Sequence, residues 1–358
     1  MLSHTAIAMS GGIDSLVAAA ILKEQGQSLL ALHFLNGYES GISPLTLGGA
    51  EANGEEQARR ALQPLADRLG IPLFIIDLRT EFQKQVVDYF VTTYGSGKTP
   101  NPCLVCNPTI KFDILMIKAR ELGADRMATG HYARIEMAED GRRRLLRGVD
   151  PQKEQSYFLS RLTQRQLAVA LLPLGGMTKE QTRHFARRRG LVPATAQESQ
   201  DVCFIKSGNY GDFLAQQPRF VPQAGTIEDL RGRVIGHHQG LHGFTIGQRR
   251  GINCPAAEPY YVVRLEPQRN CLIVGTKKDL LTSKCRVDQI NWIAPPPQGP
   301  LQVMTRVRYR HQAVPSRLIP LGADRAELLF ENPEAAVTPG QGAVFYAGEE
   351  VLGGGWIE

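Results

Sequence analysis

One short loop near the start of the chain limits its possible folds more strongly than any other segment. The loop spans residues 10–15 and reads Ser-Gly-Gly-Ile-Asp-Ser; an apolar run at 5–9 precedes it and an Ala-rich apolar stretch at 16–22 follows it. This order predicts a strand, a tight loop and a helix. Because Ser and Gly side chains are small, the backbone can approach an anion closely, and the first N–H groups of the helix point towards it. The segment therefore predicts a phosphate-binding loop.

This loop is not a Walker A motif, because it lacks the Gly-Lys-Ser/Thr sequence whose lysine reaches the terminal phosphates. A Gly-Lys-Thr triplet does occur at residues 97–99, but Pro100 and Pro102 follow it and prevent a helix from starting there. The loop at 10–15 instead resembles the pyrophosphate loop of enzymes that split ATP into AMP and pyrophosphate. That resemblance implies ATP and Mg²⁺ as cofactors.

The first 130 residues alternate between expected strands and expected helices. We expect strands at 5–9, 29–35, 73–78 and 126–129, and helices at 15–24, 55–69, 81–94 and 110–122. The alternation predicts an α/β domain with a doubly wound, mostly parallel sheet, of the adenine nucleotide alpha hydrolase type, in which ligands bind at the carboxyl ends of the strands.

The sequence pattern of the remaining chain changes twice, first to helical and then to β-rich. Residues 163–192 are expected to form two helices, the second starting at a capping box, Thr178 to Gln181. From about residue 220, short β-rich runs alternate with Gly and Pro, and the tail from about residue 285 is predicted to form a small antiparallel barrel or sandwich. We expect a catalytic ATP-binding domain at 1–210, a small central domain at 211–284 and a C-terminal β-barrel at 285–358.

Composition and charge narrow the class of protein. With 358 residues, 42% of them hydrophobic and 21% charged, the chain is typical of a globular protein of two or three domains. We see no apolar run that could span a bilayer and no signal-peptide pattern, so we expect a cytoplasmic protein with no membrane association. The net charge of +6 is gathered in arginine clusters at 142–144, 187–189, 249–250 and 306–310, which favours a nucleic-acid partner.

Three of the six cysteines form a pattern that is typical of reactive or metal-binding thiols. Cys103 and Cys106 lie just before an expected helix, where the helix N-terminus would lower the thiol pKa, and Cys203 lies in the run Val-Cys-Phe-Ile at 202–205. A Cys-x-x-Cys pair is shared by redox, zinc and iron–sulfur sites. A structural zinc site is disfavoured because the sequence lacks the second such pair that four-thiolate coordination needs.

Taken together, these segments resemble the bacterial tRNA-uridine 2-sulfurtransferases, the tRNA 2-thiouridylases of the pyrophosphate-loop ATPase superfamily. The resemblance covers nearly the whole chain. The matching segments are 10–15, 101–107, 110–112, 128–133, 155–159, 202–205, 244–251, 308–310 and 338–341. It implies that ATP activates the 2-oxygen of the wobble uridine in tRNA as an adenylate, and that a cysteine persulfide then supplies the sulfur, with release of AMP and pyrophosphate.

The resemblance also implies roles for individual residues. Cys106 would be the nucleophile, Cys203 the persulfide carrier, and Asp14 a residue that helps to hold Mg²⁺ on the departing pyrophosphate. The implied ATP contacts are Ala8, Met9, Ser10, Gly11, Gly12, Ile13, Asp14, Ser15, Phe34 and Gly130. The implied tRNA contacts are Asn101, Pro102, Cys103, His131, Lys153, Glu154, Gln155, Arg308, Tyr309 and Gln341. The implied partners are tRNA, bound in part by the central domain, and a persulfide-donating sulfur carrier protein; we expect a monomer.

Two departures from the family pattern leave alternatives open. Family members usually have aspartate where this chain has Glu154, and many have aspartate where it has Cys103. The third thiol allows an alternative in which Cys103, Cys106 and Cys203 hold a [4Fe-4S] cluster whose fourth iron binds the sulfur to be transferred. A pyrophosphate-loop amidotransferase or ligase, which would not need these thiols, and a non-catalytic RNA-binding protein are further alternatives. The intact loop at 10–15 argues against the last.

Overall fold

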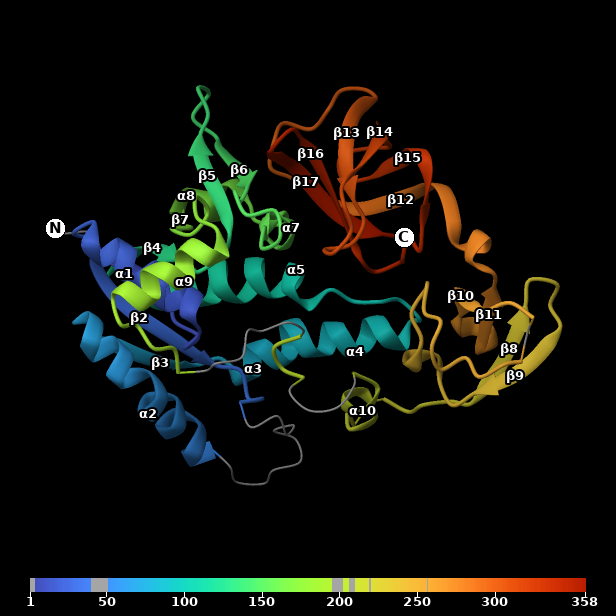
Figure 1. The fold of residues 1–358 in the computed structure, drawn as a ribbon, viewed down its shortest axis with the longest axis horizontal. Coiled ribbons are helices and arrows are strands. Elements are labelled where there is room, and N and C mark those ends of the chain that lie inside the picture. Colours follow the sequence, from blue (N-terminus) through green and yellow to red (C-terminus); the bar gives the residue numbers. More distant parts are fainter. Residues whose placement is uncertain (1–3, 40–50, 195–201, 206–209, 219, 256) are drawn as a thin grey trace. The chain divides into compact units, whose positions relative to one another are not determined.

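The computed structural model describes residues 4–39, 51–194, 202–205, 210–218, 220–255 and 257–358, with backbone only at 51–53. The chain divides into two compact units (Figure 1). The first unit comprises Met1–Val86, Cys103–Lys206 and Glu349–Leu352. The second comprises Val87–Pro102, Ser207–Gly348 and Gly353–Glu358. No helix in the described ranges is long and apolar enough to cross a bilayer.

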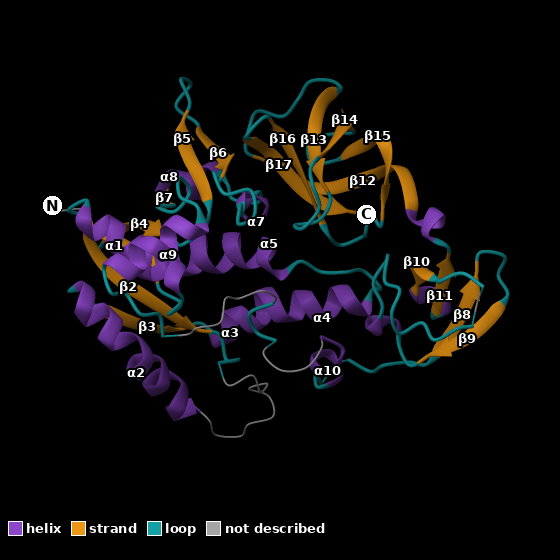
Figure 2. Cartoon of the chain, viewed as in Figure 1, coloured by secondary structure: helices purple, strands orange, loops and turns teal. Residues whose placement is uncertain are grey.

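A five-stranded sheet with the order β3-β2-β1-β4-β7 forms the centre of the first unit (Figure 2). All of its neighbouring strands are parallel, which confirms the expected sheet. The strands are β1 (His4–Ala8), β2 (Ser28–Leu35), β3 (Leu73–Asp77), β4 (Ala124–Ala128) and β7 (Ala170–Leu171). From β1 the sheet continues to β2 on one side and to β4 on the other, so the loops after β1 and β4 meet at a topological switch point.

Three helices share a hydrophobic core with this sheet: α1 (Ile13–Glu24), α2 (Glu51–Leu69) and α9 (Lys179–Arg188). Most of α1 is buried, from Ser15 through Leu22, because its Ala-rich sequence lets neighbouring elements approach closely. The capping box expected at Thr178 is present, and α9 begins at the next residue.

The other elements before residue 170 were only partly expected, and those within Val87–Pro102 belong to the second unit. The expected helix at 110–122 is the end of a longer one, formed by α5 (Pro102–Cys106), the π-helical η2 (Asn107–Ile114) and α6 (Leu115–Glu121). It starts earlier because proline is tolerated in the first turn of a helix. The expected helix at 81–94 is divided into α3 (Arg79–Phe82), η1 (Gln83–Val87) and α4 (Asp88–Gly95). The structure adds β5 (Ala133–Met137), β6 (Arg143–Arg147) and α7 (Ser156–Leu159), whereas α8 (Gln164–Val169) is the first of the two helices expected within residues 163–192.

The second unit contains a four-stranded sheet with the order β10-β11-β8-β9. Its strands are β8 (Gly225–Asp229), β9 (Val234–His238), β10 (Tyr261–Glu266) and β11 (Cys271–Gly275). A small core that includes Ile227, Phe244, Val262 and Leu272 stabilises it. Helix α10 (Tyr210–Ala215) and the short 3₁₀ helices η3 (Leu241–Gly243), η4 (Pro267–Arg269) and η5 (Lys277–Leu280) complete this part.

A closed antiparallel β-barrel follows, as expected. Its strands are β12 (Leu281–Trp292), β13 (Leu301–Arg306), β14 (Val314–Pro320), β15 (Ala326–Ala335), β16 (Gly342–Ala347) and β17 (Glu350–Ile357). The order is β12-β15-β14-β13-β16-β17, and β17 pairs with β12 to close the ring. Glycine is required where the ring closes, because a Cβ at Gly353 would lie 2.5 Å from the backbone oxygen of Asn291.

Candidate active site

The loop at residues 10–15 follows β1 and leads into α1. Gly11 has a φ of +80°, which favours glycine, and its backbone oxygen accepts a 2.9 Å hydrogen bond from the N–H of Ala194. The hydroxyl of Ser15 donates to the oxygen of Gly12 at 3.0 Å, which braces the turn. Gly12 is the N-cap of α1, and no described side chain caps this end of the helix. The first N–H groups of α1 are therefore placed to bind an anion.

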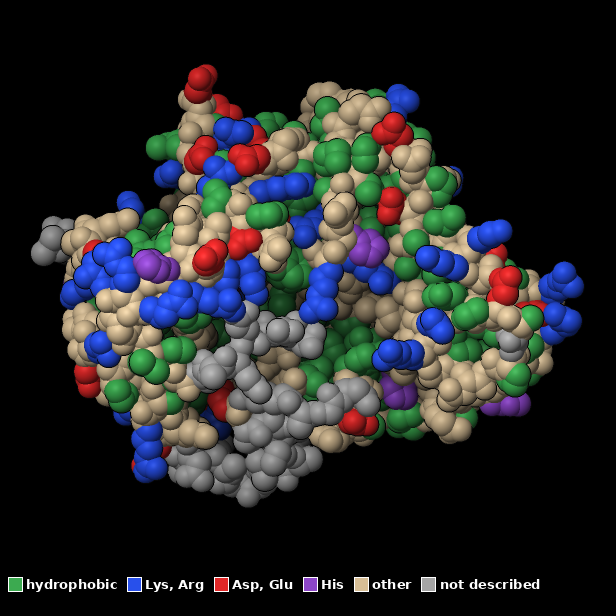
Figure 3. Space-filling view, in the orientation of Figure 1, with side chains coloured by type: hydrophobic (Ala, Val, Ile, Leu, Met, Phe, Trp, Pro, Cys, Tyr) green, Lys and Arg blue, Asp and Glu red, His purple; other side chains and the backbone are tan. Residues whose placement is uncertain are grey.

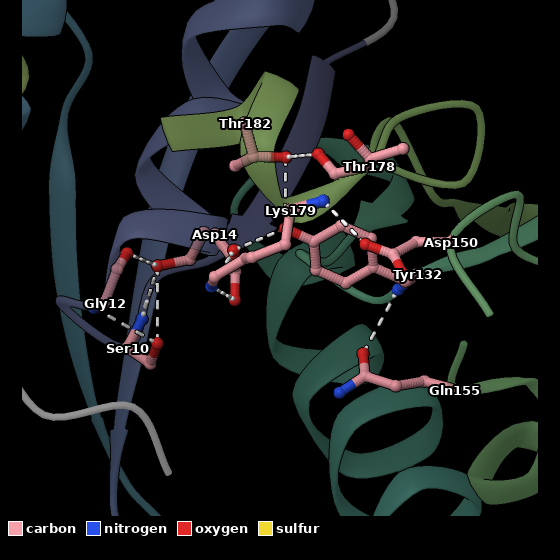
Figure 4. Close-up of polar contacts among 10 residues, drawn as sticks. Ser10, Gly12, Asp14, Tyr132, Asp150, Gln155, Thr178, Lys179 and Thr182 are labelled. Carbon is pink, nitrogen blue, oxygen red and sulfur yellow. Dashed lines mark hydrogen bonds and ion pairs between the residues drawn. The ribbon is translucent and has the colours of Figure 1, made fainter. Parts of the chain in front are cut away.

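The carboxylate of Asp14 is the centre of a polar network (Figure 4). The ammonium of Lys179 lies 2.8 Å from each of its two oxygens, and the hydroxyl of Tyr132 donates to Oδ1 at 2.7 Å. The Tyr132 hydroxyl also lies 3.0 Å from Oγ1 of Thr182. Burial raises the pKa of Tyr132 above its usual range, so the phenol stays protonated and donates. The network joins α1, the segment after β4, and α9.

The residue after β4, Thr129, and the next one, Gly130, lie beside the same loop. A Cβ at Gly130 would come within 2.8 Å of the backbone atoms of Asp14 and Ser15, so only glycine fits there. Phe34 lies near the carboxyl end of β2, with its ring centroid 6.3 Å from that of Phe82. The structure thus brings the expected ATP contacts of the loop and Gly130 together at the switch point.

Two of the three thiols lie in α5, and burial has the largest effect on their pKa values. Cys103 is half-buried and Cys106 is buried. Burial raises the pKa of Cys103 to about 11 and that of Cys106 to about 12, although the positive charge of Lys111 lowers both. The expectation of lowered thiol pKa values was therefore wrong, because desolvation of the charged form outweighs the nearby cation and the helix N-terminus.

Cys203 differs from these two thiols because it is exposed. Its charge contributes to raising the pKa of both Cys103 and Cys106, so the three sulfur atoms lie in one neighbourhood of the first unit. Its neighbour Phe204 is 1% exposed. An exposed thiol thus directly precedes a buried aromatic side chain in the sequence.

Comparisons with known proteins identify the family. A model described as the tRNA methyl transferase HUP domain matches residues 3–207, a tRNA methyl transferase PRC-barrel domain matches 211–276, and an aminomethyltransferase beta-barrel domain matches 282–357. A tRNA-specific 2-thiouridylase MnmA of Desulfosudis oleivorans is 53% identical over 98% of this chain and 94% of its own length. Those of Syntrophotalea carbinolica and Gloeothece citriformis are 46% and 44% identical, covering 99% and 100% of this chain and 98% and 100% of their own lengths.

This chain belongs to the tRNA-specific 2-thiouridylase family. The resemblance drawn from the motifs is thereby confirmed over nearly the whole length of the chain. The sequence motifs sufficed for this because they are spread through all three matched regions.

In the part of this thiouridylase-family chain that the structure describes, the three thiols are not grouped as a metal site. Among the residues that the structure describes, which include Cys103, Cys106 and Cys203, no three His, Cys, Asp or Glu side chains are arranged to hold a metal ion. The arrangement therefore does not fit the [4Fe-4S] alternative.

The tRNA contacts implied by the family are held in place by internal bonds. In the first unit, Nδ1 of His131 lies 2.7 Å from Oγ1 of Thr129, and burial lowers the pKa of His131 well below its usual range, so its ring is neutral. Glu154 is buried and accepts a hydrogen bond from the N–H of Ser156. Oε1 of Gln155 accepts one from the N–H of Tyr132 at 3.1 Å, and Lys153 is half-buried.

In the second unit, the implied tRNA contacts join neighbouring loops. Nε2 of Gln341 donates to the backbone oxygens of Thr99 and Pro100, at 3.0 and 2.9 Å, just before the buried Asn101 and Pro102. Nη2 of Arg308 donates to the backbone oxygen of Ile246 at 2.8 Å and contacts Oγ1 of Thr338. The half-buried Tyr309 has the guanidinium of Arg306 5.4 Å from its ring centroid.

The arginine clusters differ in how much charge they leave at the surface. Arg142 and Arg144 both bind the buried carboxylate of Glu350, at 2.6 and 2.8 Å, so this cluster stabilises β17 against the β5–β6 hairpin. In contrast, Arg183, Arg187 and Arg188 of α9 are exposed. Lys and Arg side chains gather on the surface of the first unit over α1 and α9 (Figure 3). This face can attract a polyanion.

Sequence reasoning missed Lys179, Tyr132 and Asp150. Lys179 lies 165 residues from Asp14 in the sequence, and its backbone N–H donates to Oδ2 of Asp150 at 2.8 Å. The capping box at Thr178 was the only sequence signal near it, and a capping box marks a helix start rather than a ligand. Only the folded chain shows that this lysine lies at the loop.

Proposed function

We propose that this chain catalyses the ATP-dependent 2-thiolation of the wobble uridine of tRNA. Membership of the thiouridylase family at 53% identity over 98% of the chain supports the activity. The observation that carries the chemistry is that one unit holds both a pyrophosphate loop at a switch point and the three thiols of Cys103, Cys106 and Cys203.

The first step would be adenylation of the base. The 2-oxygen of uracil attacks the α-phosphorus of ATP, the bond to the β-phosphate oxygen breaks, and pyrophosphate leaves. The loop at 10–15 offers N–H groups for this negative charge. Asp14 accepts three hydrogen bonds, from Lys179 twice and from Tyr132, and a carboxylate has about four lone-pair sites. One site is thus left for the Mg²⁺ that arrives with the nucleotide.

The second step would replace oxygen by sulfur. The terminal sulfur of a persulfide on Cys203 attacks C2 of the adenylated base, and AMP leaves with the former 2-oxygen. Cys106 then attacks Sγ of Cys203, the sulfur–sulfur bond breaks, and its electron pair forms the thiocarbonyl of 2-thiouridine. Cys106 loses its proton to solvent as the new disulfide forms, and an external thiol reductant restores both residues.

The proposal extends to the residues and partners that the family implies. ATP would contact residues 8–15, Phe34 and Gly130. The tRNA would contact Asn101, Pro102, Cys103, His131, Lys153, Glu154, Gln155, Arg308, Tyr309 and Gln341. The target base lies in a single-stranded loop, so it can be turned out of its stack into a pocket.

We also propose a protein partner and a domain organisation for this chain. A persulfide-donating carrier protein would reload Cys203, which its exposure supports. We further propose a cytoplasmic monomer with a catalytic domain at 1–210, a central domain at 211–284 that contacts tRNA, and a barrel at 285–358.

The test is to incubate the protein with unmodified tRNA, ATP, Mg²⁺ and a persulfide source, and to measure AMP and 2-thiouridine. Cys106→Ser and Cys203→Ser should each abolish 2-thiouridine while tRNA affinity stays within about twofold of wild type, because neither removes a phosphate contact. Cys285→Ser, in the barrel, is the matched control. AMP formation that does not depend on tRNA would favour a ligase, and absence of AMP would favour an RNA-binding protein.

A further inference from the structure

A cavity of the first unit lies at the end of α1 that is opposite the pyrophosphate loop. It is bounded by the residues that end and follow α1, by strands β4 to β7 and by α8. Helix α1 has 12 residues, and at about 1.5 Å per residue its length of about 18 Å separates the cavity from the loop. The steps proposed above therefore do not use this cavity.

Much of the wall of this cavity is apolar. Leu22 and Leu167 are buried beneath it, whereas Ile135 and Leu171 are half-buried and keep part of their apolar surface accessible. The volume is about 360 Å³, which lies within the range of about 300–1,000 Å³ that is typical of pockets for small organic molecules. The size and the wall therefore suit a small molecule with an apolar body.

Two arginines, Arg126 of β4 and Arg143 of β6, line the same cavity. Within the described part of the chain, neither guanidinium has a hydrogen bond or an ion pair, and no Asp or Glu lines the cavity. In contrast, the adjacent arginines Arg142 and Arg144 both bind the carboxylate of Glu350. The cavity thus combines an apolar wall with two positive charges that no described carboxylate compensates.

The backbone positions of both arginines are well fixed. Arg126 lies beside Thr5 in the parallel pairing of β4 with β1, and the Thr5 hydroxyl donates to Oε1 of Gln27 at 3.1 Å. The backbone N–H of Arg143 donates to Oε1 of Gln164, and its backbone oxygen accepts from Nε2 of the same side chain, both at 2.8 Å. These two bonds hold β6 against α8. Gln27 also lines the cavity, so its amide nitrogen adds a further donor.

We propose that this cavity is a second binding site, for a small organic anion that carries a carboxylate or phosphate group on an apolar body. The planar guanidiniums of Arg126 and Arg143 match the oxygens of either group, and the apolar body covers the wall at Ile135 and Leu171. An RNA backbone fits less well, because its sugars and phosphates bring no apolar body for this wall. The inference does not depend on the proposed thiolation.

Calorimetry on the full chain tests the site with four probes: phenyl phosphate, benzoate, inorganic phosphate and benzyl alcohol. We expect one of the two aromatic anions to bind most tightly, and the tighter one identifies the preferred anionic group. Inorganic phosphate lacks the apolar body and benzyl alcohol lacks the charge, so each should bind about tenfold more weakly or worse.

Arg126→Met and Arg143→Met should each weaken binding of the tighter aromatic anion about tenfold or more, the value of a hydrogen bond to a charged group. Arg165→Met is the matched control, because Arg165 is an exposed residue of α8 outside the lining of the cavity. Ala168→Trp fills the cavity without removing a charge, since Ala168 is exposed and lines it. This variant should weaken binding to a similar extent.

Three results would overturn the proposal. The first is the absence of binding to wild type, and the second is equal binding to wild type and the cavity variants, which would place the probe elsewhere. The third is an affinity for inorganic phosphate equal to that for phenyl phosphate. If the probes do not bind and the arginine variants instead reduce the salt dependence of tRNA binding by about 1 in slope, the two arginines contact RNA phosphates.

Discussion

The ring of Phe204 packs edge-on against that of Phe82, with 5.7 Å between the ring centroids. On another side, the ring of Tyr38 lies 5.8 Å away, and its hydroxyl donates to Oε1 of Gln83 at 2.7 Å. Phe204 is buried while the preceding residue, Cys203, is exposed. The aromatic contacts therefore determine where the thiol of Cys203 is presented.

Phe204→Ala should reduce sulfur transfer without affecting nucleotide binding. Removing the ring leaves the segment 202–205 without its buried anchor, and a misplacement of about 1 Å at a reacting group can cost about a hundredfold in rate. Single-turnover thiolation from persulfide-loaded protein measures the effect, and AMP binding is the internal reference.

Phe204→Leu is the matched control for this change. Leucine keeps most of the apolar volume, so it should retain much more of the rate than alanine. Equal rates for the alanine variant and wild type would show that the aromatic contacts do not position Cys203.

Thiol labelling should show a large difference between the three cysteines. Because the pKa values of Cys103 and Cys106 are raised to about 11 and about 12, both remain protonated at pH 8, and burial also blocks access to Cys106. Iodoacetamide at pH 8 should label Cys203 first, as followed by peptide mass spectrometry. Cys203→Ser should remove this fast phase. Fast labelling of Cys106 in the folded protein would contradict the structure.

The same two thiols should make stability depend on alkaline pH. The folded protein keeps their protons above the ordinary thiol pKa of 9.0, whereas the unfolded chain releases them. The free energy of unfolding should therefore fall as the pH rises from about 9 to about 12. Replacing both residues by serine should reduce this slope, as measured by denaturant unfolding; an unchanged slope would show that other groups cause it.

Tyr132→Phe should weaken adenylation by removing one hydrogen bond to Asp14. The hydroxyl donates to Oδ1 of Asp14 and lies beside Thr182, so its loss should cost about 1.5–3 kcal/mol of stability. Thermal unfolding and tRNA-dependent AMP formation measure the two effects. Thr182→Val removes the neutral partner alone and should affect AMP formation less; the reverse order would contradict the assigned network.

Arg308→Ala should lower both the stability of the second unit and its affinity for tRNA. The guanidinium joins the backbone at Ile246 to Thr338, and a phosphate contact would add a salt-dependent term. The slope of log affinity against log salt concentration should fall in magnitude by about 1. Arg317→Ala, at an exposed position of β14, is the control for removing one positive charge. An unchanged slope would show that Arg308 only joins Ile246 to Thr338 within the protein and does not contact a tRNA phosphate.

Local patterns were enough to predict much of this protein. The alternation of short apolar runs with helical stretches predicted the parallel sheet, because a strand and a helix each need a particular period of buried residues. The glycine and serine residues at 10–15 predicted the anion loop, since the required backbone geometry depends on small side chains. The short β-rich runs after residue 285 predicted the barrel for a similar reason.

Other features depended on contacts between distant segments. The raised pKa values of Cys103 and Cys106 follow from burial, which a sequence motif does not report. The sequence by itself determined the fold class and the family, because both can be recognised from short motifs and from the local spacing of apolar residues. Only the tertiary structure decided that Lys179 meets Asp14 across 165 residues, because desolvation and charge pairing depend on which surfaces the folded chain brings together.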